Sequence, residues 1–145
     1  MDALGHHLLI ELYGCDAEIL NDCERIEKVM NAAALLANAH ILESAFHQFN
    51  PHGISGVVII AESHFSIHTW PEHGYAAVDI FTCGDDLRPD LAYNYMINHF
   101  KAKSSVIVEM KRGVIPLPVL TAEQFLTTQG LIEKSREAVV CRKGR

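Results

Sequence analysis

Two short apolar runs in the middle of the chain constrain its fold most, because each predicts a strand of a buried sheet. Residues 57–61 (VVIIA) are continuous and mostly β-branched, and residues 75–82 (YAAVDIFT) lie between Gly74 and Gly84. Residues 62–74, which join the two runs, carry serines, histidines and two glutamates. The sequence therefore predicts a loop-rich centre of reactive side chains held between two strands.

The rest of the chain alternates strand patterns with two helical patterns. Apolar residues spaced by three and four predict an amphipathic helix that Asn21 or Asp22 would cap, and Pro89 suits the start of a second helix. Three further strands are predicted at residues 6–13, 40–49 and 104–110, and the two helices at residues 21–38 and 89–100. This order predicts an α+β fold, a two-layer α/β sandwich whose antiparallel sheet carries the helices on one face.

A chain of 145 residues is long enough for one domain with a buried core. We expect this domain to span residues 1–118, because the composition shifts after Pro118. Residues 119–145 are expected to form an extension, with a short helix that begins near a capping box at Thr121 and then a flexible tail.

Charge and composition exclude several classes of protein. A formal net charge of −6 argues against a nucleic-acid-binding protein, which would show a clustered basic face. No run approaches the ~18 apolar residues of a membrane span, and the N-terminus lacks the basic region of a secretory signal. The four cysteines contain no C-x-x-C and lack the spacing of a disulfide framework, so we expect a reducing, cytoplasmic location.

Ser63 directly follows a predicted buried strand and the carboxylate residue Glu62. With His68 nearby in the sequence, it would suit the nucleophile of a hydrolase. The G-x-S-x-G elbow of many such enzymes is missing, and a serine that simply ends a strand is the more common case. The residues alone leave both interpretations open.

His64, His68, His73 and Cys83 are residue types that bind zinc. Their spacing does not match H-E-x-x-H, and Pro71 disfavours a helix through the segment, so packed or solvated histidines are the more common outcome. Cys83 follows an apolar strand, where it would be a small buried side chain or a general acid or nucleophile. The sequence does not choose between these roles.

Taken together, the central residues resemble the bacterial and archaeal class of S-adenosylmethionine decarboxylase proenzymes. The matching string is residues 62–72 (ESHFSIHTWPE), followed by Tyr75, Asp79 and residues 82–85 (TCGD), with residues 53–56 (GISG) upstream. The similarity covers roughly residues 4–115. A string of this length and unusual composition is a specific signal.

The resemblance implies a proenzyme that cuts itself between Glu62 and Ser63. Ser63 Oγ attacks the Glu62 carbonyl and the peptide becomes an ester. The family implies that Ser55 and His68 assist this processing, with His68 as the proton acceptor that promotes β-elimination. The residue at position 63 then becomes a covalent pyruvoyl group with loss of ammonia, which leaves a β chain of residues 1–62 and an α chain of residues 63–145.

The resemblance also implies the reaction of the processed enzyme. The pyruvoyl group forms a Schiff base with S-adenosylmethionine and acts as the electron sink for decarboxylation. Cys83 is implied to be the proton donor to the α-carbon, a role that suits a thiol because thiols are mostly protonated near neutral pH. Phe49 and Trp70 are implied to contact the adenine and the sulfonium, and Glu72 the ribose hydroxyls. Purely structural roles are the alternatives for the two aromatic residues, with Phe49 as a core residue and Trp70 as a cover over a sheet edge.

The family further implies a homodimer with sites near the interface, Phe49 reaching the neighbouring site, no metal, and a product used in spermidine biosynthesis. Three alternatives remain. One is a pyruvoyl-dependent arginine decarboxylase of the same fold, although Trp70 and Glu72 suit a nucleoside better. The others are an unprocessed relative that only binds a partner, and a zinc-binding module. The presence of Ser55, Ser63, His68 and Cys83 together weighs against an unprocessed relative.

Overall fold

The structure is a computed structural model that describes residues 3–114. Within that range the strands are β1 (Gly5–Tyr13), β2 (Ile41–Gln48), β3 (Ile54–Ile60), β4 (Ser63–Trp70), β5 (Tyr75–Thr82) and β6 (Ser104–Arg112). The helices are α1 (Ala17–Leu20), α2 (Cys23–Leu36) and α3 (Pro89–Phe100), and a 3₁₀ turn, η1 (Pro71–His73), joins β4 to β5.

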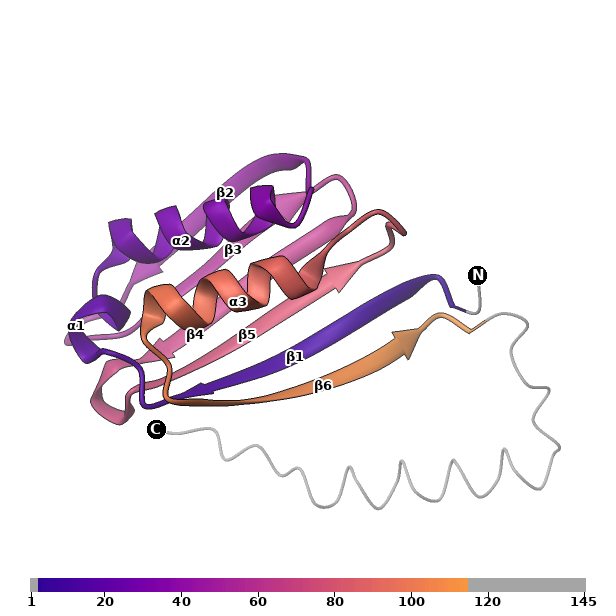
Figure 1. Cartoon of the computed structure of the whole chain (residues 1–145). Coiled ribbons are helices and arrows are strands. Elements are labelled where there is room, and N and C mark those ends of the chain that lie inside the picture. Colours follow the sequence, from indigo (N-terminus) through magenta and orange to yellow (C-terminus); the bar gives the residue numbers. More distant parts are fainter. Residues whose placement is uncertain (1–2, 115–145) are drawn as a thin grey trace, which may run out of the picture. The chain divides into compact units, whose positions relative to one another are not determined.

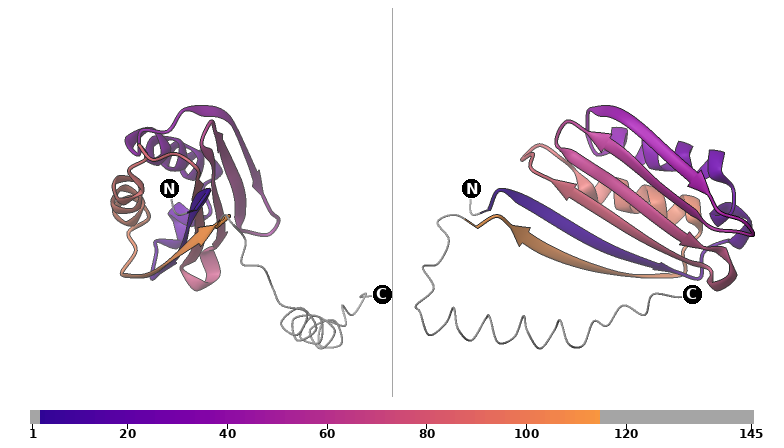
Figure 2. Two further views of the ribbon diagram at one scale, coloured as in Figure 1. Left: turned by 90° about the vertical axis from the view of Figure 1, so that its right-hand side faces the viewer. Right: turned by 180° about the vertical axis from the view of Figure 1, so that it is seen from behind.

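All six strands belong to one antiparallel sheet in the order β2-β3-β4-β5-β1-β6. Helices α2 and α3 pack beside each other on one face of the sheet, as Figure 1 shows. Figure 2 shows the opposite face, which no described helix covers. The predicted α+β sandwich, with an antiparallel sheet and helices on one face, is confirmed.

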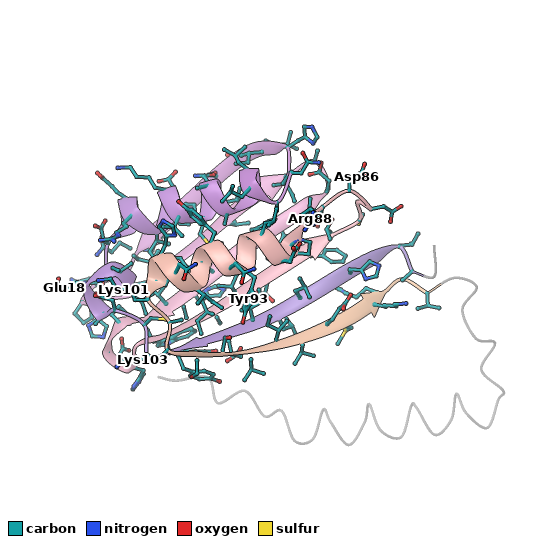
Figure 3. The ribbon with its side chains drawn as sticks, viewed as in Figure 1. Glu18, Asp86, Arg88, Tyr93, Lys101 and Lys103 are labelled. Atoms are coloured by element: carbon teal, nitrogen blue, oxygen red, sulfur yellow. The ribbon has the colours of Figure 1, made fainter. Side chains whose placement is uncertain are left out.

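Local sequence explains where the two long helices begin and end. Asp22 caps α2, because its Oδ1 accepts a hydrogen bond from the amide of Arg25 at 3.0 Å. Pro89 occupies the first turn of α3, where a missing amide hydrogen costs nothing, and Lys101 in a left-handed conformation ends the helix. Helix α3 therefore runs from the loop that contains Asp86 and Arg88 to Lys101 at its far end (Figure 3).

The core lies between the helices and the sheet. Its largest fully buried side chains include Phe65, Ile67 and Ile80 from the sheet, and Met30, Met96 and Phe100 from α2 and α3. Burying each of these side chains stabilises the fold by about 1.5–3 kcal/mol. The sheet is thereby fixed on its helical side.

The expectation of a loop-rich centre was wrong, because Ser63–Trp70 forms strand β4 in the middle of the sheet. Phe65, Ile67 and Thr69 are buried toward the helices, while the residues between them are more accessible. This alternation is that of a strand with one covered face. The reactive side chains therefore stand on a rigid strand rather than in a loop.

The uncovered side of the sheet, which we call the open face, carries alternate residues of every strand. On β6, the side chains of Val106, Val108 and Met110 lie on one side of the strand and are each about half exposed. Their register partners on β1 include Leu9 opposite Val108 and His7 opposite Met110. In a single chain, the open face therefore exposes apolar side chains to solvent.

The chain order in the sheet has one feature that bears on self-cleavage. Strand β1 precedes position 62, yet it pairs on one side with β5 and on the other with β6, which both follow position 63. Strand β3, which also precedes the position, pairs with β4, which follows it. Strands from the two sides of the Glu62–Ser63 bond are therefore interleaved, because β1 lies between β5 and β6.

The end of the predicted domain at residue 118, and the helix and tail expected in residues 119–145, lie outside the described residues. Within residues 3–114, no helix is long and apolar enough to cross a membrane. The cysteines in this range, Cys15, Cys23 and Cys83, are all free thiols.

Candidate active site

The candidate residues form two clusters at opposite ends of β4. The cleavage-site cluster, at the start of the strand, contains Glu62, Ser63 and Cys83. The pocket, at the other end, contains Phe49, Ser55, His68, Trp70 and Glu72. Ser63 and Trp70 begin and end β4, so these two residues lie about 23 Å apart at roughly 3.3 Å per residue.

The Glu62–Ser63 peptide lies at the end of the hairpin that joins β3 to β4. Ile60 and Ser63 are register partners, which leaves Ala61 and Glu62 as the tight connection. Ser63 has a φ of +145°, in a region that favours glycine and strains other residues. The backbone is therefore strained at the bond that the sequence predicts to be cut.

The carbonyl group of Glu62 already has a hydrogen-bond donor. The amide of Cys83 donates to the Glu62 carbonyl oxygen at 2.8 Å. Attack of a nucleophile on this carbonyl would place negative charge on the same oxygen, which the amide would stabilise. The backbone of Cys83 can thus support cleavage independently of its thiol.

The side chain of Glu62 is fixed by His40, which directly precedes β2. His40 Nδ1 lies 2.7 Å from one carboxylate oxygen, and the His40 amide donates to the other at 3.2 Å. The hydrogen bond from the His40 ring lowers the pKa of the Glu62 carboxyl. A β-carbon added at Gly84 would lie 3.0 Å from Glu62 Cγ, so the loop after β5 also packs closely against the glutamate.

The histidine next to the candidate nucleophile is His64, not His68. His64 Nδ1 lies 3.3 Å from Ser63 Oγ. Partial burial lowers the pKa of His64, and the nearby His7 and Arg112 lower it further. The ring of Phe81 flanks His64, with 5.9 Å between ring centroids. The neutral imidazole, which can accept a proton, is therefore favoured beside Ser63.

His68 pairs with Ser55 instead. The two residues are register partners on β4 and β3, and Ser55 Oγ lies 2.7 Å from His68 Nδ1. His68 lies five positions after Ser63 along the extended strand, a distance of about 17 Å. Proximity in sequence suggested that His68 lies near Ser63, but within one chain the extended strand keeps them apart.

The pocket brings together the three residues expected to bind substrate. Phe49, Trp70 and Glu72 line a hollow of about 360 Å³, together with Ser55 and His68. Phe49 is 49% exposed and Trp70 is 40% exposed, so the alternative that places Phe49 in the core is wrong. Two aromatic faces and a carboxylate suit a ligand with a planar base and hydroxyl groups.

Neighbouring side chains orient the residues of the pocket. Trp70 stacks on Tyr75, with ring centroids 5.2 Å apart, and the Tyr75 hydroxyl donates to the carboxylate of Glu11. His52 Nε2 lies 3.1 Å from a carboxylate oxygen of Glu72, and this contact joins the loop after Phe49 to the η1 turn.

A polar network on the open face was not predicted from the sequence. Asp79 lies 3.0 Å from His7 Nε2 and accepts a hydrogen bond from Ser66 at 3.1 Å. The Arg112 guanidinium lies 4.8 Å from the ring centre of Phe81 and 3.4 Å from His7 Nδ1. The alternation of β1 and β5 would have placed His7 and Asp79 on one face, but their pairing depends on a register that the sequence does not reveal.

The four zinc candidates do not converge. His64 and His68 lie about 13 Å apart along β4, and Cys83 lies at the His64 end of the strand, beside Glu62. In the part of the chain that the structure describes, no three His, Cys, Asp or Glu side chains are grouped to hold a metal ion.

Comparisons with known proteins match this arrangement to one family. The model of the family described as S-adenosylmethionine decarboxylase matches residues 6–113. The S-adenosylmethionine decarboxylase proenzyme of Acetivibrio thermocellus is 57% identical over 122 residues, which cover 84% of this chain and 98% of the relative. The proenzyme of the same description from Clostridium kluyveri is 60% identical over 114 residues, covering 79% of this chain and 90% of the relative.

A solved structure is similar in fold as well as in sequence. The crystal structure of the adenosylmethionine decarboxylase from Aquifex aeolicus superposes with a TM-score of 0.74 at 40% sequence identity. The match covers 83% of this chain and the whole of that one.

Proposed function

The chain belongs to the S-adenosylmethionine decarboxylase family, and we propose that it is a proenzyme that cuts itself at Glu62–Ser63 and then decarboxylates S-adenosylmethionine. The observation that carries the proposal is the contact between the Cys83 amide and the Glu62 carbonyl oxygen, beside a strained Ser63. Cleavage would yield a β chain of residues 1–62 and an α chain of residues 63–145. The product, decarboxylated S-adenosylmethionine, would serve spermidine biosynthesis.

The residues at the cleavage site fit the formation of a pyruvoyl group from Ser63. The hydroxyl belongs to the residue that directly follows the carbonyl it must attack, and the oxygen of that carbonyl has an amide donor. Once formed, the group supplies a carbonyl that withdraws electrons from the α-carbon of a bound amino acid. Cys83 follows β5 beside this position and its side chain is exposed, which supports a role as proton donor to that carbon.

The pocket supports a nucleoside-containing substrate. Phe49 and Trp70 offer aromatic faces to an adenine and a sulfonium, and Glu72 can accept hydrogen bonds from both ribose hydroxyls. A guanidinium substrate such as arginine would need the carboxylate but not two aromatic faces. We therefore propose S-adenosylmethionine as the substrate.

We further propose that each active site combines two chains of a homodimer. Within one chain Trp70 of the pocket lies about 23 Å from Ser63 along β4, too far for one small substrate to contact both. Packing of two open faces about a twofold axis would set the cleavage-site cluster of one chain against the pocket of the other. The half-exposed Val106, Val108 and Met110 support burial of this face by a second copy. The same packing would bring Ser55 and His68 of the partner to the cleavage site, where His68 would promote β-elimination.

The free thiols at Cys15, Cys23 and Cys83 support a reducing compartment, and we propose that the protein is cytoplasmic.

The mass of the denatured protein tests self-cleavage directly. We expect two fragments, residues 1–62 and residues 63–145, the second lighter by one ammonia than its sequence mass and blocked at its N-terminus. The variant Ser63→Ala should remain one chain with the mass of its sequence. A wild-type chain that stays whole after long incubation would overturn the proposal.

Release of labelled CO₂ by the processed protein tests the substrate. S-adenosylmethionine labelled at its carboxyl group should release CO₂, and labelled arginine should not, with the uncut Ser63→Ala chain as the blank. Release from arginine alone would leave self-cleavage intact but replace the proposed substrate.

A further inference from the structure

The hydroxyl of Ser63 must lose its proton as it attacks the Glu62 carbonyl, and we propose that His64 of the same chain accepts this proton. The inference rests on the proposed self-cleavage and names the residue that starts it. His64 Nδ1 lies 3.3 Å from Ser63 Oγ. This is within reach of a general base, since such contacts are often long before the reaction begins.

Among the described side chains, His64 is the one that hydrogen-bonds to Ser63 Oγ. His68 lies about 17 Å away along β4 and is engaged by Ser55. A base supplied by the partner chain would require the dimer to form before cleavage could start. His64 removes that requirement for the first step.

The surroundings of His64 favour a neutral ring. Burial opposes the imidazolium form, and electrostatic interactions with His7 on β1 and Arg112 on β6 lower the pKa of His64 further. Asp79 on β5 opposes this effect, but it is already engaged by His7 and by Ser66. The pKa of His64 is therefore lowered, and near neutral pH the ring is ready to accept a proton.

The proposed step balances without another reactant. The proton moves from Ser63 Oγ to a nitrogen of His64 as the bond from Oγ to the Glu62 carbonyl carbon forms. The negative charge moves to the carbonyl oxygen, where the Cys83 amide stabilises it. The amide C–N bond then breaks, and His64 returns the proton to the nitrogen that leaves as the amine of residue 63. The product is an ester, and nothing is oxidised or reduced.

The experiment follows newly made full-length chain from cell-free synthesis and measures ester formation separately from chain scission. Neutral hydroxylamine cleaves esters but spares ordinary peptide bonds, so samples with and without it distinguish the two steps. The variants are His64→Ala and His68→Asn. His99→Ala is a matched control, because His99 lies in the last turn of α3 and contacts the Tyr95 carbonyl.

We expect His64→Ala to form ester about 100-fold more slowly than wild type, the usual contribution of a general base. Added imidazole should restore part of the rate. His68→Asn should instead accumulate a whole chain that hydroxylamine cuts, since its role lies in the later elimination. His99→Ala should match wild type. Circular dichroism verifies that each variant is folded, and His64→Asn replaces His64→Ala if the latter is not.

The pH dependence of ester formation in the wild-type chain gives a second readout. A base must be unprotonated, so the rate should fall as the pH decreases. The pH at which the rate falls to half should lie below the ordinary histidine pKa of about 6.5, because the pKa of His64 is lowered. A rate independent of pH between about 5 and 7.5 would overturn the role of His64.

The role is also overturned if a folded His64 variant forms ester at the wild-type rate, or if it accumulates ester as His68→Asn should. These results would leave the proposed function standing, provided that the wild-type chain is cut. A wild-type chain that is never cut would overturn both.

Discussion

Ser55 and His68 face each other across neighbouring strands, with 2.7 Å between the serine Oγ and the histidine Nδ1. The pair lies in the pocket with Trp70 and Glu72, at the opposite end of β4 from Ser63. Residues that the family resemblance assigns to one process are thus divided between two ends of a strand. A twofold dimer would reunite them, with one end supplied by each chain.

Mixing two inactive variants should therefore restore activity. Ser63→Ala lacks the residue that becomes the pyruvoyl group, and Trp70→Ala lacks an aromatic face of the pocket. Co-expression should form mixed dimers in which one of the two sites combines an intact Ser63 with an intact Trp70. Random pairing predicts roughly a quarter of wild-type decarboxylation, measured as CO₂ release.

The control for this experiment carries both changes in one chain, co-expressed with Ser63→Ala. No site can then be complete, and activity should stay at the level of the blank. Activity no higher than the sum of the two variants alone would mean that each site is built within one chain.

Replacing the thiol of Cys83 should separate cleavage from turnover. Cys83→Ala retains the backbone amide that donates to the Glu62 carbonyl oxygen, so self-cleavage should proceed. Turnover should fall by about 100-fold, the usual contribution of a general acid, with little change in substrate binding. Single-turnover and steady-state CO₂ release, with the α-chain mass measured over time, would reveal enzyme lost through misplaced protonation.

Cys83→Ser is the companion variant, because it keeps a weaker proton donor and should fall between Ala and wild type. A Cys83→Ala enzyme that turns over normally for many cycles would remove the thiol from the reaction.

Loss of His40 should slow self-cleavage by releasing the Glu62 side chain. In His40→Ala the carboxylate loses its donor at 2.7 Å, and the peptide that carries the reacting carbonyl gains freedom. We expect cleavage about tenfold slower, which is the effect of about 1.4 kcal/mol on a barrier. The measurement is the fraction of uncut chain over time on a denaturing gel.

Glu62→Ala is the control that tests whether His40 acts through the Glu62 side chain. If His40 acts through the Glu62 side chain, adding His40→Ala to Glu62→Ala should have no further effect on the rate. An equal tenfold loss in both backgrounds would show that His40 acts through another contact.

Removing the Tyr75 hydroxyl should destabilise the open face. Burial and the adjacent Glu11 carboxylate raise the pKa of Tyr75, so its hydroxyl keeps the proton that it donates to Glu11. Tyr75→Phe should lower the free energy of unfolding by about 1 kcal/mol. Urea titration in the uncut Ser63→Ala chain measures this on one covalent molecule.

Tyr95→Phe is the matched control, because the Tyr95 ring stacks on His99 and that contact does not need the hydroxyl. Equal losses in the two variants would contradict a specific role for the bond between Tyr75 and Glu11.

The sequence predicted most of the sheet and both long helices, but not β4, the strand that carries the candidate site. Residues 75–82 and 89–100 were predicted with the bounds they have, because apolar runs there end at clear glycine and proline signals. β4 alternates apolar and polar residues as a strand should, yet its polar positions are histidines and serines that resemble a reactive loop. One buried face was enough to make it a strand.

The members of the candidate site were predictable, but their distribution was not. Ser63 and His68 are five positions apart in the sequence, but the distance between them in space depends on the backbone conformation. Only the extended strand β4 makes that distance large. The role of His40 could not be predicted from the sequence, for a different reason. Its contact with Glu62 joins residues 22 positions apart, through a register between β2 and β3 that includes a bulge.

Cutting the chain at Glu62–Ser63 would produce two polypeptides whose strands are interleaved in a single sheet. β1 of the shorter piece lies between β5 and β6 of the longer piece, so neither can leave without breaking the hydrogen bonds of a neighbour. The mature protein would therefore hold together without a covalent link. Once denatured, however, its two pieces would have to meet again by diffusion, and recovery would depend on protein concentration. The intact precursor folds as one molecule, so cleavage would convert a repeatable folding reaction into one that the protein completes efficiently only once.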